Sequence, residues 1–123
     1  MQDNVLNMVM FAVPCGPPGL PVVDNVTSSS IAFHWSKPSD TGNGKLQGYI
    51  VEIKPTGSDW KVINVVLVRE LKVVVRDLTE GQEYQFRVKA VNEAGPGAPS
   101  TATRPVVAKK PAGWSADNYR VLD

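Results

Sequence analysis

Residues that could act as catalytic nucleophiles or bases are few in this chain and lie far apart. His34 is the only histidine and Cys15 the only cysteine. The apolar and polar alternation around His34 places its ring on the outward side of a strand, with no carboxylate fixed beside it. A serine, histidine and aspartate relay needs all three groups within hydrogen-bond reach in a cleft. The sequence therefore predicts no catalytic residues and no enzyme.

Metal and cofactor sites are not indicated either. The single Cys15 permits no intrachain disulfide and no cysteine-based zinc site, and it precedes the first expected strand without a base nearby. It is predicted to be a free thiol, which favours a reducing compartment. The acidic residues Asp40, Asp59, Asp77 and Glu80 stand singly, unlike the ligands of a calcium loop. We expect no metal and no cofactor.

The charge balance and the length of the apolar run near the N-terminus argue against two classes of partner, nucleic acid and membrane. Thirteen basic and twelve acidic residues give a formal net charge of +1, and no basic cluster exceeds Lys109-Lys110. Nucleic-acid binding requires a dense basic face, so that class is set aside. The apolar run 8–13 is too short to cross a bilayer and lacks the basic residues that open a signal peptide. We therefore expect neither nucleic acid nor membrane as a partner.

Residues 78–92 carry the strongest structural pattern. A polar turn follows Leu78, and from Tyr84 to Ala90 apolar and polar residues alternate. This period of two predicts a strand with one side on a core and the other in water. Tyr84 enters the strand directly after the turn. There its buried ring can return the hydroxyl to nearby backbone, the tyrosine-corner arrangement of Greek-key sandwiches.

Other short segments show strand patterns separated by turns that contain Gly and Pro. They cover residues 22–27, 31–35, 49–54, 60–68, 71–76 and 98–105. In residues 60–68, apolar residues occupy both sets of alternate positions, so the sequence does not fix which side of that strand faces the core. Short strands at intervals of about eight to twelve residues, without a helical period, predict an all-β fold. The expected architecture is a seven-stranded antiparallel Greek-key β-sandwich. An odd number of strands places the two chain ends at opposite poles.

A family resemblance rests on four residues in order: Trp35, Tyr49, Leu78 and Tyr84 resemble the signature of fibronectin type III domains. A more detailed pattern is similar to the modules of giant muscle proteins of the titin, twitchin and myosin-binding protein C group. That pattern comprises Pro17-Pro18, Val26-Thr27, Pro38, Asp40, Gly42, Gly44, Gly48–Lys54, Trp60, Asn64, Glu80-Gly81, Asn92, Ala94-Gly95 and Pro99-Ser100.

The resemblance implies a fibronectin type III domain at residues 17–108. Residues 1–16 are then an N-terminal extension or linker, and residues 109–123 a C-terminal tail or linker, both expected to be flexible. Two departures from the pattern stand out. Thr41 and Asn43 interrupt the glycines that titin-like modules usually carry there, and the chain after Lys110 does not resemble the start of another module.

The resemblance also implies which surface is available for a protein partner. In this fold the third, fourth and sixth strands lie side by side, so their outward cations should form a basic stripe with Glu52 and Gln85 between them. Trp60 is either an aromatic anchor for the partner or a cover for cation stems in its own sheet. The alternative is an ordinary solvated face whose mixed charge keeps the domain soluble. The candidate protein-binding surface comprises Lys54, Trp60, Lys61, Arg87, Lys89 and, in the polar loop 92–97, Glu93.

Two functions fit these observations. The first is a non-enzymatic structural and interaction module of a multidomain intracellular muscle protein. It would act in the cytoplasm, at the sarcomere or cytoskeleton, as a spacer between immunoglobulin-like or fibronectin type III neighbours and as a unit that binds myosin or another filament component. The alternative is a module of an extracellular adhesion or receptor protein. The acceptor pattern Asn25-Val26-Thr27 for N-glycosylation favours that second location.

Overall fold

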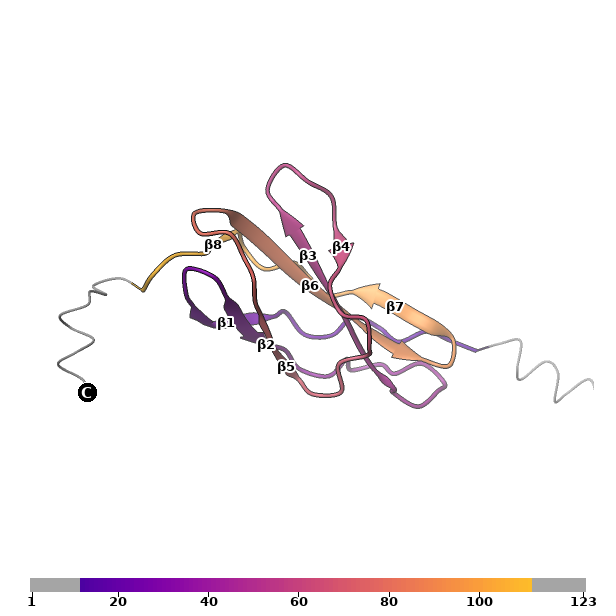
Figure 1. Ribbon diagram of the computed structural model, residues 1–123. Coiled ribbons are helices and arrows are strands. Elements are labelled where there is room, and N and C mark those ends of the chain that lie inside the picture. The colour runs from indigo at the N-terminus through magenta and orange to yellow at the C-terminus, as the bar shows by residue number, and fades with distance from the viewer. Residues whose placement is uncertain (1–11, 112–123) are drawn as a thin grey trace, which may run out of the picture.

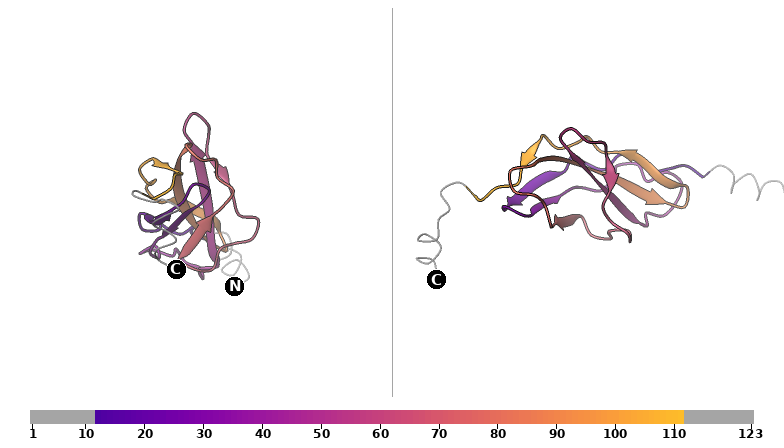
Figure 2. Two further views of the ribbon diagram at one scale, coloured as in Figure 1. Left: turned by 60° about the vertical axis from the view of Figure 1, so that its left-hand side comes forward. Right: turned by 45° about the horizontal axis from the view of Figure 1, so that its top comes forward.

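The fold is a sandwich of two antiparallel sheets, as a computed structural model of the 123-residue chain shows for residues 12–111. The smaller sheet has the order β1 (Val22–Val26), β2 (Ile31–His34) and β5 (Lys72–Val75). The larger sheet has the order β4 (Lys61–Val62), β3 (Gly48–Pro55), β6 (Glu83–Asn92) and β7 (Gly95–Pro99), and β8 (Val106–Val107) also pairs with β6. The described chain enters at one pole and leaves at the other (Figures 1 and 2). The predicted all-β Greek-key sandwich is confirmed.

The core lies between the sheets and is built from alternate residues of β2, β3 and β6. The rings of Phe33 and Phe86 meet across it with centroids 4.9 Å apart, which joins the two sheets. Trp35 packs edge-on against Tyr49 with centroids 5.3 Å apart. Burying one such side chain contributes about 1.5–3 kcal/mol. The residues with no exposed surface include Ile31, Phe33, Val51, Phe86, Val88 and Ala90.

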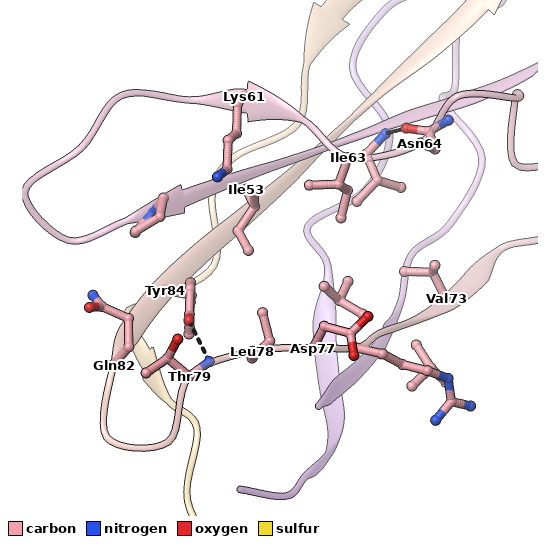
Figure 3. Close-up of a pocket in the computed structure, with 15 residues that line it drawn as sticks. Ile53, Lys61, Ile63, Asn64, Val73, Asp77, Leu78, Thr79, Gln82 and Tyr84 are labelled. Carbon is pink, nitrogen blue, oxygen red and sulfur yellow. Dashed lines mark hydrogen bonds between the residues drawn. The ribbon is translucent and has the colours of Figure 1, made fainter. Parts of the chain in front are cut away.

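The predicted tyrosine corner is present. The buried Tyr84 accepts a hydrogen bond at its hydroxyl from the backbone N–H of Thr79, at 2.9 Å (Figure 3). Leu78, the residue before Thr79, packs against the core and donates its own N–H to the carbonyl of Ser29 at 2.9 Å. The turn before β6 is therefore tied to both sheets.

The expected strand at 60–68 is shorter in the structure. Only Lys61–Val62 pairs with β3 in a regular ladder. The side-chain amide of Asn64 then replaces backbone pairing, because its Oδ1 accepts from the Val51 N–H at 2.8 Å and its Nδ2 donates to the Tyr49 carbonyl at 3.1 Å. Backbone bonding to β3 resumes at Val68, opposite Tyr49.

The expected seventh strand at 98–105 overlaps the observed β7 only at Ala98 and Pro99, and a further strand, β8, follows the expected range, so the described residues hold eight strands in place of seven. β7 begins at Gly95, inside the predicted polar loop 92–97, and β8 follows Pro105. Between them, the hydroxyls of Ser100 and Thr103 accept the N–H groups of Val88 and Phe86, each at 3.0 Å. The backbone N–H groups of Ser100 and Thr103 also bond to the carbonyls of Val88 at 2.8 Å and Phe86 at 2.9 Å, so side chains and backbone together continue the contact with β6 between the two strands.

Residues 13–16, which the sequence assigns to the N-terminal extension, pack against the pole where the chain enters. Cys15 is buried, and the Gly16 N–H bonds to the Asp40 carbonyl at 2.7 Å. A Cβ on Gly97 would lie 2.1 Å from the Cys15 carbonyl oxygen, so only glycine permits this approach. The rest of the extension, residues 1–11, and residues 112–123 of the tail lie outside the described part of the chain.

The entry segment is held mainly by Asn92, at the end of β6. Its buried side-chain amide donates to the carbonyls of Val13 at 2.8 Å and Thr41 at 2.9 Å. The Val13 N–H in turn bonds to Oδ1 of Asn43 at 2.7 Å. We call this set of bonds, which links Asn92 to Val13 and Thr41 and links Val13 to Asn43, the entry latch. Sequence reasoning treated Asn92 only as part of a pattern and did not predict this role.

Candidate functional site

The candidate surface lies on the outer face of β3 and β6. These strands pair antiparallel, with Glu52 opposite Arg87, Lys54 opposite Gln85 and Ile50 opposite Lys89. Residues directly opposite or two apart share one face of a sheet. Lys54, Arg87 and Lys89 therefore point out from the same face, and the structure brings together these three predicted cations.

Glu52 lies at the centre of this face and is only 7% exposed. Its Oε1 accepts a hydrogen bond from Nε of Arg87 at 2.6 Å, and its Oε2 lies 3.2 Å from Nζ of Lys89. Both cation side chains are themselves 25% exposed. The sequence places Glu52 between cations on a solvated face, whereas the structure covers it with them. One carboxylate therefore neutralises part of the predicted basic stripe.

The environment of Glu52 keeps it ionised. Burial by itself disfavours the carboxylate, but the hydrogen bonds and positive charges of Arg87 and Lys89 outweigh burial and lower the pKa of Glu52 below its ordinary value of 4.5. Removing the Glu52 carboxylate would lower stability by more than the ion pairs contribute, because Arg87 and Lys89 would stay partly desolvated without a counter-charge. The three residues are thus one electrostatic unit.

Trp60 stacks on this unit. The guanidinium carbon of Arg87 lies 4.2 Å from the centroid of the Trp60 ring, so Arg87 is held between an aromatic face and the Glu52 carboxylate. A cation over an indole contributes about 0.5–1 kcal/mol at exposed sites. The structure shows Trp60 against a cation of its own sheet, and its role as an anchor for a partner stays a prediction. Trp60 remains half-buried, with part of its ring in solvent.

Two of the six predicted residues lie elsewhere. Lys61 pairs with Ile53, whose side chain points into the core, so Lys61 belongs to the inner side of the sheet and lines the opening between the sheets. Glu93 lies at the entry pole, where its Oε1 accepts the N–H of Lys45 at 2.9 Å. The prediction for Lys61 was wrong because the register of its strand could not be read from the sequence.

His34 has a carboxylate beside it, contrary to the sequence-based expectation. Its Nδ1 lies 2.8 Å from Oδ2 of Asp24, and the two side chains are 50% and 47% exposed. Asp24 is the extra residue of a bulge in β1, between the pairs Val23 with Phe33 and Asn25 with Ala32. A bulge cannot be located from an alternation this weak.

Cys15 is buried at the entry pole, where burial and the nearby Asp40 carboxylate raise the pKa of its thiol. A thiol in such a setting reacts slowly. Within residues 12–111, no three His, Cys, Asp or Glu side chains gather as metal ligands. The same part of the chain has no helix long and apolar enough to span a membrane.

The family model described as fibronectin type III domain matches residues 16–106. The chain belongs to the fibronectin type III family. Cardiac-type myosin-binding protein C from Homo sapiens is 39% identical over 102 residues, which cover 80% of this chain and 8% of that protein. Myosin-binding protein H from Gallus gallus is 35% identical over 89 residues, covering 72% of this chain and 17% of the relative. This fibronectin type III domain thus spans under a fifth of these relatives.

Solved structures of titin domains are also similar to this chain. The crystal structure of titin domains A168–A170 superimposes with a TM-score of 0.75 at 32% identity, covering 80% of this chain and 34% of that one. Titin module A71 from human cardiac muscle has a TM-score of 0.62 at 38% identity, with 74% of this chain and 92% of that one covered. The predicted similarity to modules of muscle proteins is confirmed.

Proposed function

We propose that this domain is a non-catalytic structural and interaction module of a multidomain muscle protein in the cytoplasm. The observation that carries the proposal is that the two ends of the described part of the chain lie at opposite poles of the sandwich (Figure 1). Modules built in this way join head to tail and space their neighbours by one domain length. The similarity to titin modules and myosin-binding proteins supports this role.

The spacer role makes a mechanical prediction. Pulling the full chain by its ends should unfold the domain in one discrete step, because the two sheets share one core. Residues 12–111 would then release about 300 Å of contour length, at about 3.3–3.6 Å per residue less the folded length. Single-molecule force spectroscopy measures this step. Gradual extension without a discrete event would count against a spacer that resists load.

The filament-binding role is assigned to the outer face of β3 and β6, with myosin or another filament protein as partner. Three cations, Lys54, Arg87 and Lys89, share this face with the carboxylate of Glu52, so the face keeps a positive balance. Such a face steers association with an acidic rod surface more than it adds affinity. Lys54 is the cation of this face that makes no ion pair among residues 12–111.

Lys54 therefore provides the cleanest test. Reversing the charge of Arg87 or Lys89 would also break the ion pairs with Glu52, whereas Lys54→Glu reverses a charge without breaking an ion pair among residues 12–111. We expect the Lys54→Glu chain to co-sediment less with myosin filaments, and the loss to shrink as salt rises. The matched control is Lys109→Glu, an exposed lysine outside the outer face of β3 and β6. Equal binding by both variants and the unchanged chain would remove this face from the proposal without affecting the spacer role.

A further inference from the structure

A groove opens between the two sheets on the side where β4 and β5 form their edges. Its volume is about 650 Å³, and its walls carry Ile53, Ile63 and Tyr84 from the larger-sheet side and Val73 and Leu78 from the other side (Figure 3). This size lies within the range of pockets that bind ligands or peptide side chains. The groove is separate from the outer face of β3 and β6.

The backbone edge beside this groove is unpaired. β5 is the last strand of its sheet. The Trp35 N–H bonds to the Leu71 carbonyl at 2.9 Å, which makes Leu71 a hydrogen-bonded partner of that neighbouring strand. Because bonded positions alternate along an antiparallel pair, Val73 and Val75 also bond toward β2, and the N–H and C=O groups of Lys72 and Val74 point to the free edge.

The charges along the edge select the kind of strand that fits. Lys72 and Arg76 stand on either side of the exposed Val74, which is 45% exposed. Lys61 also lines the groove, and Asp77 is the carboxylate among its lining residues. A second copy of this chain, paired antiparallel about Val74, would set Lys72 opposite Arg76, and like charges directly opposite are destabilising. An acidic strand would meet cations at both positions.

We propose that the free edge of β5 and the adjoining groove bind an extended acidic segment of another protein, which adds to the smaller sheet as a fourth strand. Its acidic residues lie four apart, opposite Lys72 and Arg76. The residues just inside them are apolar and point into the groove beside Val73 and Val75, while the central residue faces outward over Val74. Main-chain hydrogen bonds supply affinity and the alternate side chains supply specificity.

The probe is a synthetic peptide with the core Glu-Val-Thr-Val-Glu, flanked by Gly and Ser and blocked at both ends. It is titrated into the isotope-labelled full chain and followed by amide NMR. We expect saturable shifts at Lys72, Val74 and Arg76, with side-chain shifts at Ile53 and Ile63 in the groove. A peptide with Lys in place of both Glu residues should bind roughly tenfold more weakly or not at all.

A charge-swap variant makes the test specific. The double variant Lys72→Glu with Arg76→Glu should lose roughly tenfold in affinity for the acidic peptide and gain affinity for the Lys peptide. The matched control is Arg104→Glu with Lys109→Glu, two exposed cations away from this edge. Thermal unfolding of both variants verifies that they fold.

Three results would overturn the proposal. The first is the absence of saturable shifts up to about 1 mM peptide. The second is equal affinity for the acidic and the Lys peptides. The third is a set of shifts confined to the outer face around Lys54 and Lys89, which would assign peptide binding to the surface already described.

Discussion

The hydroxyl of Tyr84 accepts the backbone N–H of Thr79 at 2.9 Å, while the hydroxyl of Tyr49 is buried without a hydrogen-bond partner among residues 12–111. Both rings are core residues of the same sandwich. Burial raises the pKa of Tyr49, the neighbouring Cys15 raises it further, and the Trp35 indole opposes the rise without meeting hydrogen-bond geometry. One hydroxyl therefore stabilises the fold and the other does not.

Replacing each tyrosine by phenylalanine separates these two cases. Tyr84→Phe removes the acceptor of the Thr79 N–H, so we expect the free energy of unfolding to fall by about 1–2 kcal/mol. Tyr49→Phe removes a buried polar atom that makes no bond, so stability should change by less than about 0.5 kcal/mol or rise. Urea unfolding measures both. Equal losses from the two variants would contradict the assignment of the tyrosine corner.

Glu52→Gln should destabilise the domain by about 1–3 kcal/mol, because Arg87 and Lys89 would lose their counter-charge while staying partly covered. The matched control is Glu80→Gln, since Glu80 is exposed and has no ion pair within the described residues. The free energy of unfolding in urea decides the comparison. If the two variants lose equally little, the Glu52 unit is no more than a surface ion pair.

Acid should weaken the domain partly through Glu52. The pKa of Glu52 in the folded chain lies below its ordinary value of 4.5, so its contribution is fully present above that value and is lost as pH falls through the folded pKa. Urea midpoints measured between pH 7 and pH 3 should fall most steeply below about 4.5. The Glu52→Gln chain should show a shallower fall in that window. Parallel curves for both chains would refute the lowered pKa.

Cys15 reports on the entry latch. Because it is buried and the pKa of its thiol is raised, a thiol reagent should modify the native chain on the order of 100-fold more slowly than the unfolded chain. Asn92→Ala removes the two hydrogen bonds that its amide donates to Val13 and Thr41, and the one that it accepts from Ala94, and should speed modification. The control, Asn25→Ala, changes an exposed asparagine and should leave the rate unchanged. An unaltered rate in Asn92→Ala would show that the latch does not cover Cys15.

Gly97→Ala tests the close approach of the entry segment to β7. The new Cβ would lie 2.1 Å from the Cys15 carbonyl oxygen, so the segment must move away. We expect a loss of about 1–3 kcal/mol in unfolding free energy and faster hydrogen exchange at the Gly16 N–H, which bonds to Asp40. Ala98→Ser, at the exposed next position, serves as the control. Unchanged exchange at Gly16 would mean that the approach is looser than described.

Much of the fold could be predicted because its strands have one apolar side. The alternation from Tyr84 to Ala90 gave β6, its inward face and the tyrosine corner. The first three residues of β7, Gly95, Pro96 and Gly97, escaped prediction because they carry no apolar pattern. The strand at 60–68 was misread for the opposite reason, since apolar residues fill both parities and the Asn64 side chain ends the ladder.

Of the candidate site, the alternation of residues along each strand could predict only which side chains share a face. Parity placed Lys54, Arg87 and Lys89 on one outer face, and the structure agrees. The contact of Glu52 with Arg87 depends on the register between two strands whose residues lie 35 positions apart, and no local pattern fixes that register. The displacement of Lys61 and the bulge that brings Asp24 to His34 likewise follow from pairing and not from composition.

The entry latch has a consequence for orientation. The backbone of Val13 is hydrogen-bonded both to Asn43 and to Asn92, so its position relative to the sandwich is restricted. Asn92 ends the same strand that carries Arg87 and Lys89. The orientation of residues 13–16 relative to the charged outer face of β3 and β6 is therefore fixed.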